Sequence, residues 1–465
     1  MTHYDLVIIG SGSGNSIVNH EFADWKVAIC EKGTFGGTCL NVGCIPTKMF
    51  VYPADLAHTA NHADDLGIAL RREDVRWAEI RDRIFRRIDP ISVAGRYWRA
   101  DSNENVTLYE GHARFTGPGT LDTGTGETIT ADRFVLAAGS RAVVPDIEGL
   151  DQVPFHTSDT IMRVDDLPRR IGIIGGGFVA AEFAHVFGSF GSEVVLVNRS
   201  DRLLRQEDAD VSERFTELAR RRWDVRLNTR TTKVEGYDGR IRLHLDSDGT
   251  PDTVEVDTLL VATGRRSNSD GLDLERVGVE VDDTGLVLVD DYQRTNVEGI
   301  WALGDISNRW QLKHVSNHEA RVVQHNLLHP DDLVPADHSF VPSAVFSSPQ
   351  VASVGVTEAE AQEQGLAYVT ARQAYGDTAY GWAMEDTTSF AKVLADPDTG
   401  LLLGAHILGA QASNLIQPLV QAMRFGQTAQ QVARDQFWIH PALSEVVENA
   451  LLGLDLDATS TATPG

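Results

Sequence analysis

Hydrophobic and polar positions follow the same order in two separate segments of the chain. YDLVIIGSGSGNSIVNHEFA, from Tyr4, and RIGIIGGGFVAAEFAHVFGSFG, from Arg170, each run from an apolar stretch through a glycine-rich turn into a helical stretch. A second apolar stretch follows in each segment, KVAICE ending at Glu31 and EVVLVNR ending at Arg199. This order predicts a strand, a helix and a parallel strand. The chain is therefore expected to be an α/β protein with two Rossmann-like dinucleotide-binding domains.

The remaining segments suggest how these domains are connected. RFVLAAG, residues 133–139, precedes the second unit and LLVATGR, residues 259–265, ends it, so the second unit is inserted into the first, which resumes near GIWALGD. From about Phe340, short strands with turn signals alternate with helical stretches, which predicts a C-terminal α+β domain. We expect residues 1–149 to form the first part of one nucleotide-binding domain, 150–265 the other, 266–338 the return to the first, 339–454 the α+β domain and 455–465 a disordered tail.

Charge and hydropathy exclude some classes of partner. The net charge of -26 opposes nucleic acid binding, because a phosphate backbone would be repelled. No apolar run approaches the ~18 residues that a membrane span needs. The N-terminal MTHYDLVIIG carries an acidic residue where a signal peptide is basic, so we expect a cytoplasmic protein.

The first glycine-rich turn departs from the GxGxxG pattern at one position. Gly10 and Gly12 are in place, but the third glycine is replaced by Asn15, with Gly14 beside it. The third glycine allows the helix to pack closely on the strand, so its replacement affects this packing and leaves the phosphate contact in place. Glu31 lies 21 positions after Gly10, where a carboxylate accepts hydrogen bonds from ribose hydroxyls. The first site is therefore expected to bind an adenosine diphosphate group without a 2′-phosphate.

The second turn predicts a different dinucleotide. Gly175 and Gly177 are followed by Ala180, and the second strand ends in Asn198 and Arg199 without a carboxylate. Arginines bind a phosphate dianion through charge-assisted hydrogen bonds, whereas an acid would repel it. This site is therefore expected to prefer NADPH over NADH. The alternative is that the arginines of this region pair with acids on the surface: Arg199, Arg202 and Arg205 with Asp201, Glu207 and Asp208.

Two of the three cysteines lie five residues apart, in GGTCLNVGCIPTK. Five helical residues rise ~7.5 Å, beyond the usual ~6.8 Å limit for the Cα atoms of a disulfide. A bridge between Cys39 and Cys44 therefore needs an irregular turn, for which Gly43 is suited. Pro46 disfavours the α conformation at the residue before it, Ile45.

We accordingly expect the pair to open a helix that runs on through Lys48. The dipole at the start of a helix lowers the pKa of thiols and favours thiolate. A structural zinc site needs a second ligand pair, and the chain has none, so no metal is expected. The third cysteine, Cys30, lies in an apolar strand and is expected to be a buried structural thiol.

GGTCLNVGCIPTK also resembles the active-site signature of the FAD-dependent pyridine nucleotide disulfide oxidoreductases, a family that includes glutathione reductase and dihydrolipoyl dehydrogenase. The resemblance covers nearly the whole chain and includes the AAG and ATG strand ends at 137–139 and 262–264, WALGD at 301–305 and WIHPALSEVVENALL near the C-terminus. It implies FAD in the first site, NADPH in the second, and a homodimer held by the C-terminal domain.

The resemblance also implies roles for particular residues. Cys44 faces the flavin as a thiolate, and Cys39 attacks the substrate disulfide. His440 of the partner subunit, oriented by Glu445, is the acid and base. The implied flavin contacts are Gly10, Gly12, Gly14, Glu31, Gly37, Thr38, Lys48, Ala113, Gly139, Gly304, Asp305 with the ribityl chain and His314 near the pyrimidine end. The implied NADPH contacts are Gly175, Gly177, Phe178 over the nicotinamide, Glu182 paired with Lys48, Arg199, Arg205 and Gly264.

Three details narrow the substrate within the family. The arginines after the second strand oppose the NAD preference of dihydrolipoyl dehydrogenases, the tail lacks the cysteine pair of mercuric reductases, and SIVNHEF has His20 but no arginine for a glutathione carboxylate. Long stretches, among them YGDTAYGWAMEDT and QFWIHPALSEVVENALLGL, resemble the members that act on mycothione, the disulfide of a cysteine-bearing inositol glycoside. Tyr375, Tyr380 and Trp382 are candidates for holding its sugar, with core packing as the alternative.

Two other functions stay open. One is the reduction of a different small disulfide, such as glutathione disulfide or lipoamide. The other is a flavoprotein redox sensor without catalysis, against which the presence of His440 and Glu445 counts.

Overall fold

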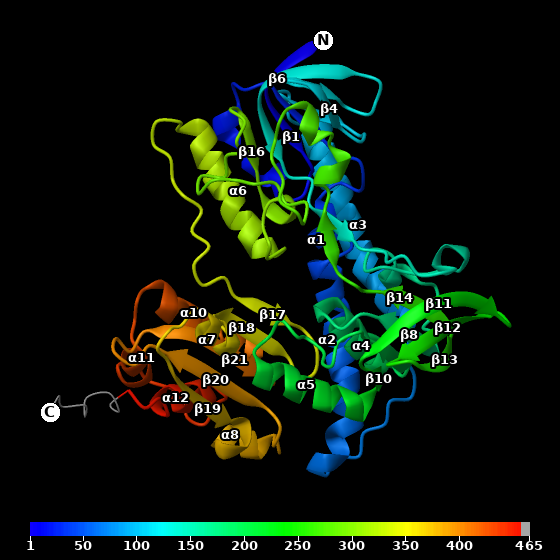
Figure 1. Ribbon diagram of the computed structural model, residues 1–465, viewed down its shortest axis with the longest axis vertical. Coiled ribbons are helices and arrows are strands. Elements are labelled where there is room, and N and C mark those ends of the chain that lie inside the picture. Colours follow the sequence, from blue (N-terminus) through cyan, green and yellow to red (C-terminus); the bar gives the residue numbers. More distant parts are fainter. Residues whose placement is uncertain (457–465) are drawn as a thin grey trace.

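The structure, a computed structural model, describes residues 1–456 apart from the side chains of residues 61 and 62. The expected tail therefore lies outside the described residues beyond its first two positions. Figure 1 shows an upper domain built on β1 and β6, a lower domain built on β8 and α4, and a C-terminal domain beside the latter. The predicted α/β class, with two dinucleotide-binding folds and a C-terminal α+β domain, is confirmed.

The first nucleotide-binding domain contains a mixed sheet in the order β3-β2-β1-β6-β5-β4, with β16 paired to β6. Residues alternate along β1, so that Leu6 and Ile8 pack on α6 while Val7 and Ile9 pack into the core of the other face. A strand buried on both faces explains its unbroken apolar pattern. The strands are β1 (Thr2–Ile9), β2 (Val27–Cys30), β3 (Val106–Tyr109), β4 (Arg114–Gly117), β5 (Thr120–Asp122), β6 (Thr128–Leu136) and β16 (Ile300–Ala302), and the helices are α1 (Gly37–Asn41), α2 (Cys44–His62), α3 (Trp77–Asp101) and α6 (Lys313–Leu328).

The prediction of a helix after the first glycine-rich turn is wrong. The chain there forms only two short 3₁₀ turns, Gly14–Ile17 and His20–Phe22. Arg99 of α3 donates hydrogen bonds to the backbone carbonyls of Asn15 and Val18, at 2.7 and 2.8 Å. In a continuing helix, these carbonyls would accept hydrogen bonds from backbone amides four residues further on. A residue 84 positions away in the sequence thus replaces local helical bonding.

The second nucleotide-binding domain has a parallel sheet in the order β10-β9-β8-β14. Its glycine-rich turn is followed by a regular α-helix, α4 (Phe178–Phe190), as predicted. A three-stranded antiparallel sheet covers one face of the parallel sheet, and α4 covers the other. The other elements are β8 (Arg170–Ile174), β9 (Glu193–Val197), α5 (Ala209–Arg222), β10 (Asp224–Arg226), β11 (Thr229–Tyr237), β12 (Arg240–Ser247), β13 (Thr250–Val256) and β14 (Thr258–Val261), with β7 (Ser140–Ala142) and β15 (Arg265–Ser267) paired at the junction with the first domain.

The C-terminal domain is an antiparallel sheet in the order β17-β18-β21-β20-β19, with helices packed against it. Every residue of β20 is buried. Its strands are β17 (Ser343–Val345), β18 (Val351–Gly355), β19 (Val369–Ala374), β20 (Phe390–Ala395) and β21 (Leu402–Leu408), and its helices are α7 (Glu358–Glu363), α8 (Ala379–Ala383), α9 (Ala412–Leu415), α10 (Gln417–Arg424), α11 (Ala429–Arg434) and α12 (Ser444–Leu452).

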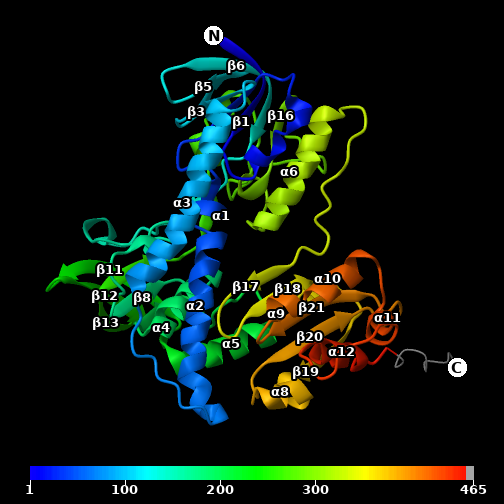
Figure 2. The ribbon, with the colours of Figure 1, turned by 180° about the vertical axis from the view of Figure 1, so that it is seen from behind.

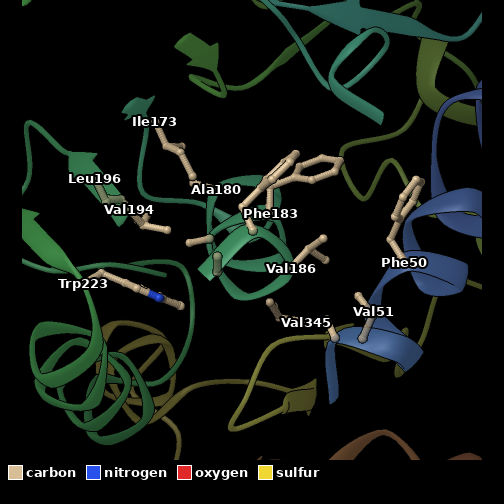
Figure 3. Close-up of a cluster of buried hydrophobic side chains, with 14 of the residues drawn as sticks. Phe50, Val51, Ile173, Ala180, Phe183, Val186, Val194, Leu196, Trp223 and Val345 are labelled. Carbon is tan, nitrogen blue, oxygen red and sulfur yellow. The ribbon is translucent and has the colours of Figure 1, made fainter. Parts of the chain in front are cut away.

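One apolar core joins the three domains. Figure 2 shows α2 and α3 side by side, reaching from the upper sheet down to the level of β8 and α4. In Figure 3, Phe50 of α2, Phe183 of α4 and Val345 of β17 converge on this core, and each is at most 4% exposed. The helix that begins at Cys44 is therefore packed against elements of both other domains.

Candidate active site

The backbone at the first glycine-rich turn lies against a neighbouring strand. Gly10 has φ +109°, and a Cβ there would lie 2.2 Å from the carbonyl oxygen of Ala137. A Cβ at Gly14 would lie 2.6 Å from the Ala137 Cβ, so Gly14 provides the close packing that Asn15 seemed to remove. Only glycine fits either place. The Glu31 carboxylate lies beside this turn and accepts hydrogen bonds from the Ser11 amide at 2.9 Å and the Ser11 hydroxyl at 2.6 Å.

A cavity of about 450 Å³ extends from this turn to the cysteine pair and on to α4. Most of the predicted flavin contacts line it, and Gly14 and His314 do not. The contacts that line it are Gly10, Gly12, Glu31, Gly37, Thr38, Lys48, Ala113, Gly139, Gly304 and Asp305, together with the two cysteines Cys39 and Cys44 and with Phe178 and Glu182 from the predicted NADPH contacts. An elongated cavity with a glycine-lined end and carboxylates suited to hydroxyl groups fits a flavin dinucleotide.

The two cysteines lie on either side of a helix break. Cys39 is in α1 and Cys44 is the first residue of α2, and between them Gly43 adopts φ -129° and ψ -124°. A Cβ at Gly43 would lie 2.9 Å from the Thr38 carbonyl oxygen. The expectation for Ile45 is wrong, because α2 already includes it. Pro46 falls in the first turn of α2, where a missing N–H costs no helical hydrogen bond.

Both cysteines of the pair are free thiols in hydrogen-bond contact. The Cys39 thiol donates to the Cys44 sulfur, and together with the Lys48 charge this lowers the pKa of Cys44 to about 7. The same hydrogen bond and burial raise the pKa of Cys39. The two sulfurs are therefore unequal, with the thiolate on Cys44. Burial raises the pKa of Cys30 to about 12, as expected of an inert structural thiol.

An ion pair connects the cysteine helix to the second nucleotide-binding domain. Lys48 Nζ of α2 lies 2.7 and 2.9 Å from the two carboxylate oxygens of Glu182 on α4. Glu182 also accepts from the Phe346 amide at 2.9 Å, and the Lys48 ammonium lies 4.6 Å from the centroid of the Phe346 ring. The Lys48–Glu182 pair expected from the sequence is present.

At the opposite wall, a chain of hydrogen bonds fixes Asp305. Ser140 Oγ donates to Asp305 Oδ2 at 2.7 Å, and Arg265 Nε donates to Ser140 Oγ at 2.9 Å. The hydrogen bond from Ser140 thus fixes one carboxylate oxygen of Asp305, and Asp305 itself lines the cavity. Sequence reasoning missed Ser140 and Arg265, although they directly follow Gly139 and Gly264.

The start of α6 places a lysine where the sequence suggested a histidine. His314 does not line the cavity, and its Nε2 lies 2.9 Å from the Pro342 carbonyl oxygen. Its neighbour Lys313 lines the cavity and donates to Ser13 Oγ at 2.8 Å. Its charge offsets part of the rise in the pKa of Cys39 that the Cys44 hydrogen bond and burial cause. No local pattern marked Lys313, which lies 300 residues from its partner.

The second glycine-rich turn repeats the strand contact of the first. Gly175 has φ +135°, and a Cβ there would lie 2.1 Å from the Ala262 carbonyl oxygen. Gly177 precedes α4 without a side-chain cap, so the first amides of the helix are free to bind a phosphate. Phe178 lines the cavity and is half exposed, while Gly175, Gly177 and Gly264 lie outside its lining.

The two arginines predicted to select NADPH are exposed and follow residues that touch this turn. A Cβ at Gly176 would lie 2.6 Å from Asn198 Cγ, and Gly176 accepts a hydrogen bond from the Leu204 amide at 2.8 Å. Arg199 and Arg205 come directly after Asn198 and Leu204. Within residues 1–456, neither of these two arginines forms an ion pair, whereas Arg202 pairs with Glu213 at 3.4 Å.

The predicted acid–base pair is formed but lies outside the cavity. His440 Nδ1 is 2.6 Å from Glu445 Oε1, and the histidine side chain is 71% exposed. Glu445 also accepts from the Ala442 amide at 3.3 Å. Neither His440 nor Glu445 lines the cavity that contains the cysteines, so one chain does not bring all four residues together.

The sugar-binding candidates occupy different environments. Tyr375 is fully buried and donates a hydrogen bond to the Ala410 carbonyl at 3.0 Å. Its environment agrees with the alternative that this residue packs in the core. Tyr380 and Trp382 are exposed on α8. Among the described residues, no cluster of three or more histidine, cysteine or acidic side chains is arranged to hold a metal ion. No helix of residues 1–456 is long and apolar enough to cross a membrane.

Known proteins resemble the chain along its whole length. Residues 4–320 match the pyridine nucleotide-disulphide oxidoreductase family and residues 341–451 match its dimerisation domain. Mycothione reductase of Mycobacterium tuberculosis is 52% identical over 98% of this chain and all of its own. Glutathione reductase of Burkholderia cepacia is 34% identical over 95% of this chain and 97% of its own.

A solved structure is also similar to this chain along nearly its whole length. The HOCl-induced flavoprotein disulfide reductase RclA of Escherichia coli has a TM-score of 0.84 and 27% identity, covering 97% of this chain and 99% of its own. FAD and NADPH, the cofactors predicted from the sequence, are those of this family. The dimerisation domain makes the protein a homodimer. The chain belongs to the pyridine nucleotide-disulphide oxidoreductase family and is a flavoprotein disulfide reductase.

Proposed function

We propose that the protein reduces mycothione to two molecules of mycothiol with NADPH, using FAD and the Cys39–Cys44 pair, and so maintains thiol redox balance. The observation that carries the substrate is the 52% identity to a mycothione reductase over 98% of the chain. The reaction consumes one NADPH and one proton for each disulfide. A working thiol pair needs a reducing compartment, so we place the reaction in the cytoplasm.

The residues around the cavity fit the two cofactors. The turn at Gly10 and the carboxylates of Glu31 and Asp305 suit the flavin dinucleotide, while Gly177 at the start of α4 suits the pyrophosphate of NADPH. When bound, FAD relays two electrons from NADPH to the cysteine pair. Lys48 keeps a positive charge beside the flavin side of Cys44, and Phe178 covers the nicotinamide pocket.

The cysteines take separate roles. The Cys39 thiol gives up its proton to His440 as its sulfur attacks one sulfur of the substrate. The substrate S–S bond breaks, a mixed disulfide forms, and the first mycothiol leaves with that proton. The Cys44 thiolate, favoured by a pKa of about 7, then attacks the Cys39 sulfur. This step releases the second mycothiol and forms the Cys39–Cys44 disulfide again.

His440 supplies the proton for the leaving thiolate, and it does so from the partner subunit. Its exposure, its hydrogen bond to Glu445 and its position in the dimerisation domain support this assignment. In one chain the residue lies outside the cavity, so a second copy is needed to complete the site.

Mixed dimers test that arrangement. Cys39→Ser and His440→Gln homodimers should each lose disulfide reduction yet keep reduction of the flavin by NADPH. A heterodimer of the two variants should regain up to about half of the wild-type activity, because one of its two composite sites has both residues. A heterodimer without activity would place His440 in the site of its own chain.

The substrate is tested directly with the purified yellow protein. NADPH or NADH is supplied with mycothiol disulfide, glutathione disulfide or lipoamide in turn, and cofactor oxidation is followed optically. We expect the highest kcat/KM with NADPH and mycothiol disulfide. Faster turnover with lipoamide and NADH would contradict the proposal.

A further inference from the structure

The segment between β9 and α5, residues 199–208, carries both exposed arginines and is called here the arginine loop. Its first part is held by the glycine-rich turn. Asn198 lies against Gly176 and donates to the Arg202 carbonyl at 2.9 Å, and the Leu204 amide donates to Gly176. Leu204 is buried with φ +49°, a backbone conformation that side chains rarely adopt without support from their surroundings.

The far end of the arginine loop is held by the C-terminal domain. Asp208 Oδ1 accepts from Lys392 Nζ of β20 at 2.9 Å, and Asp208 Oδ2 accepts from the Glu358 amide of α7 at 3.1 Å. The neighbouring Glu207 accepts from the Ser353 hydroxyl of β18. Two successive loop residues are thus bound to three elements of another domain.

Lys392 is buried in this contact and pairs with three carboxylates. Its side chain is 5% exposed, that of Asp208 is fully buried, and its ammonium also lies 2.9 Å from Asp210 and 2.7 Å from Glu358. Burial alone would raise the pKa of Asp208, but the Lys392 hydrogen bond, the charge of His406 and the Glu358 amide hold it below its usual range. Without Lys392, three neighbouring carboxylates would lack a counter-charge, and the loop end would have to move toward water.

We propose that Lys392 is a positioning residue for NADPH selectivity, because by holding Asp208 it fixes the arginine loop in the conformation that presents Arg199 and Arg205 to the 2′-phosphate. The inference rests on the proposed function, in which these two arginines bind that phosphate. The dimerisation domain of each subunit thereby takes part in selecting the dinucleotide in its own chain.

The expected effect is selective for the 2′-phosphate. Displacing the loop end moves the arginines, whereas the turn at Gly175 and the start of α4 bind parts that NADPH and NADH share. A general disturbance of the fold would weaken both dinucleotides. The ratio between them therefore separates positioning from a merely structural role.

The test uses the FAD-loaded homodimer of Lys392→Met. We expect the KM for NADPH to rise about tenfold, the KM for NADH to change less than about twofold, and kcat at saturating NADPH to stay within about twofold of wild type. Calorimetry provides a readout independent of turnover. The dissociation constant of adenosine 2′,5′-bisphosphate should rise about tenfold, and that of adenosine 5′-monophosphate should stay unchanged.

A matched control lies in the same domain. Tyr375→Phe removes one buried hydrogen bond within the C-terminal domain, to Ala410, and should leave the NADPH to NADH ratio at the wild-type value. Equal losses for both dinucleotides in Lys392→Met, or no change in either, would overturn the inference.

Two further variants keep the result interpretable. If Lys392→Met fails to assemble, Ser353→Ala should raise the KM for NADPH about threefold and spare NADH, and an unchanged ratio there would overturn the inference. Arg205→Leu is measured in parallel. An unchanged NADPH KM in Arg205→Leu would overturn the arginine assignment of the proposed function, whereas a raised KM there with an unchanged ratio in Lys392→Met and Ser353→Ala overturns only the role of Lys392.

Discussion

Gly10 and Gly175 occupy equivalent places in the two nucleotide-binding domains, yet the chain continues differently after them. A Cβ would lie 2.2 Å from a strand carbonyl oxygen at one and 2.1 Å at the other. After Gly10 the chain forms a four-residue 3₁₀ turn, and after Gly175 a 13-residue α-helix. The close contact between turn and strand is therefore the shared requirement, while a long helix is not.

The positive charge near the two glycine-rich turns comes from different groups. The uncapped start of α4 offers backbone amides and the helix dipole. Beside the first turn, the side chain of Lys313 donates to Ser13 and brings a full charge into the cavity. A backbone dipole cannot be removed by substitution, but a lysine can, so the two sites respond differently to mutation.

The largest expected effect comes from adding a methyl group at each turn. Gly10→Ala and Gly175→Ala should each cost about 3–5 kcal/mol of folding stability, from the carbonyl overlap and the positive φ together, and Gly10→Ala should also lose FAD. Gly175→Ala should keep FAD and lose reduction by NADPH. Chemical unfolding and the flavin absorbance measure both. Equal FAD loss in the two variants would contradict the separate assignment of the turns.

The next effect concerns the arginines of the second site. Arg199→Leu and Arg205→Leu together should raise the KM for NADPH between about tenfold and a hundredfold, since a charge-assisted hydrogen bond contributes about 1.5–3 kcal/mol. The KM for NADH should stay nearly constant. Arg202→Leu is the control, because Arg202 already pairs with Glu213. Similar losses with both dinucleotides would exclude a 2′-phosphate contact.

The ion pair where the two sites meet predicts a pH dependence. Lys48 helps to hold the pKa of Cys44 at about 7, below its ordinary value of 9.0, so the thiolate is present above pH 7 and is lost as the pH falls through it. Lys48→Met should raise this midpoint by about one unit, equivalent to about 1.4 kcal/mol. Thiolate absorbance of the reduced protein follows the titration. Lys48→Arg should keep the midpoint, and a wild-type midpoint in Lys48→Met would refute the role of the charge.

The smallest effect tests the lysine beside the first turn. Because Lys313 lowers the pKa of Cys39, Lys313→Met should slow alkylation of Cys39 about threefold near neutral pH, measured in a Cys44→Ser background. Lys32→Met removes another lysine that lines the cavity and should leave the rate unchanged. An unchanged rate in Lys313→Met would show that its charge does not reach the cysteine.

Sequence patterns found what depends on neighbours in the chain. The glycine turns and the helix opening at Cys44 follow from residues a few positions apart, and the buried Cys30 follows from its place in an apolar strand. The resemblance to a family implied the pairing of His440 with Glu445. The resemblance to a family added the Lys48–Glu182 pair, whose members lie 134 positions apart.

What the patterns missed depends on distant residues. The helix after the first turn is absent because Arg99 bonds its carbonyls. Lys313, Arg265 and Lys392 reach partners that lie 300, 125 and 184 positions away in the sequence. The error at Ile45 has a local cause, since Pro46 is tolerated in a first helical turn. His440 lies outside the cavity that contains the cysteines, so the proposed site that joins them needs a second copy of the chain.

The apolar core shared by the three domains has a consequence for how ligands enter. Phe50 of α2, Phe183 of α4 and Val345 of β17 pack together, so the two nucleotide-binding domains cannot swing apart without exposing this core to water. We therefore expect the two nucleotide-binding domains to keep their relative position. In the proposed function, the half-exposed Phe178 ring is the part that we expect to move when NADPH binds.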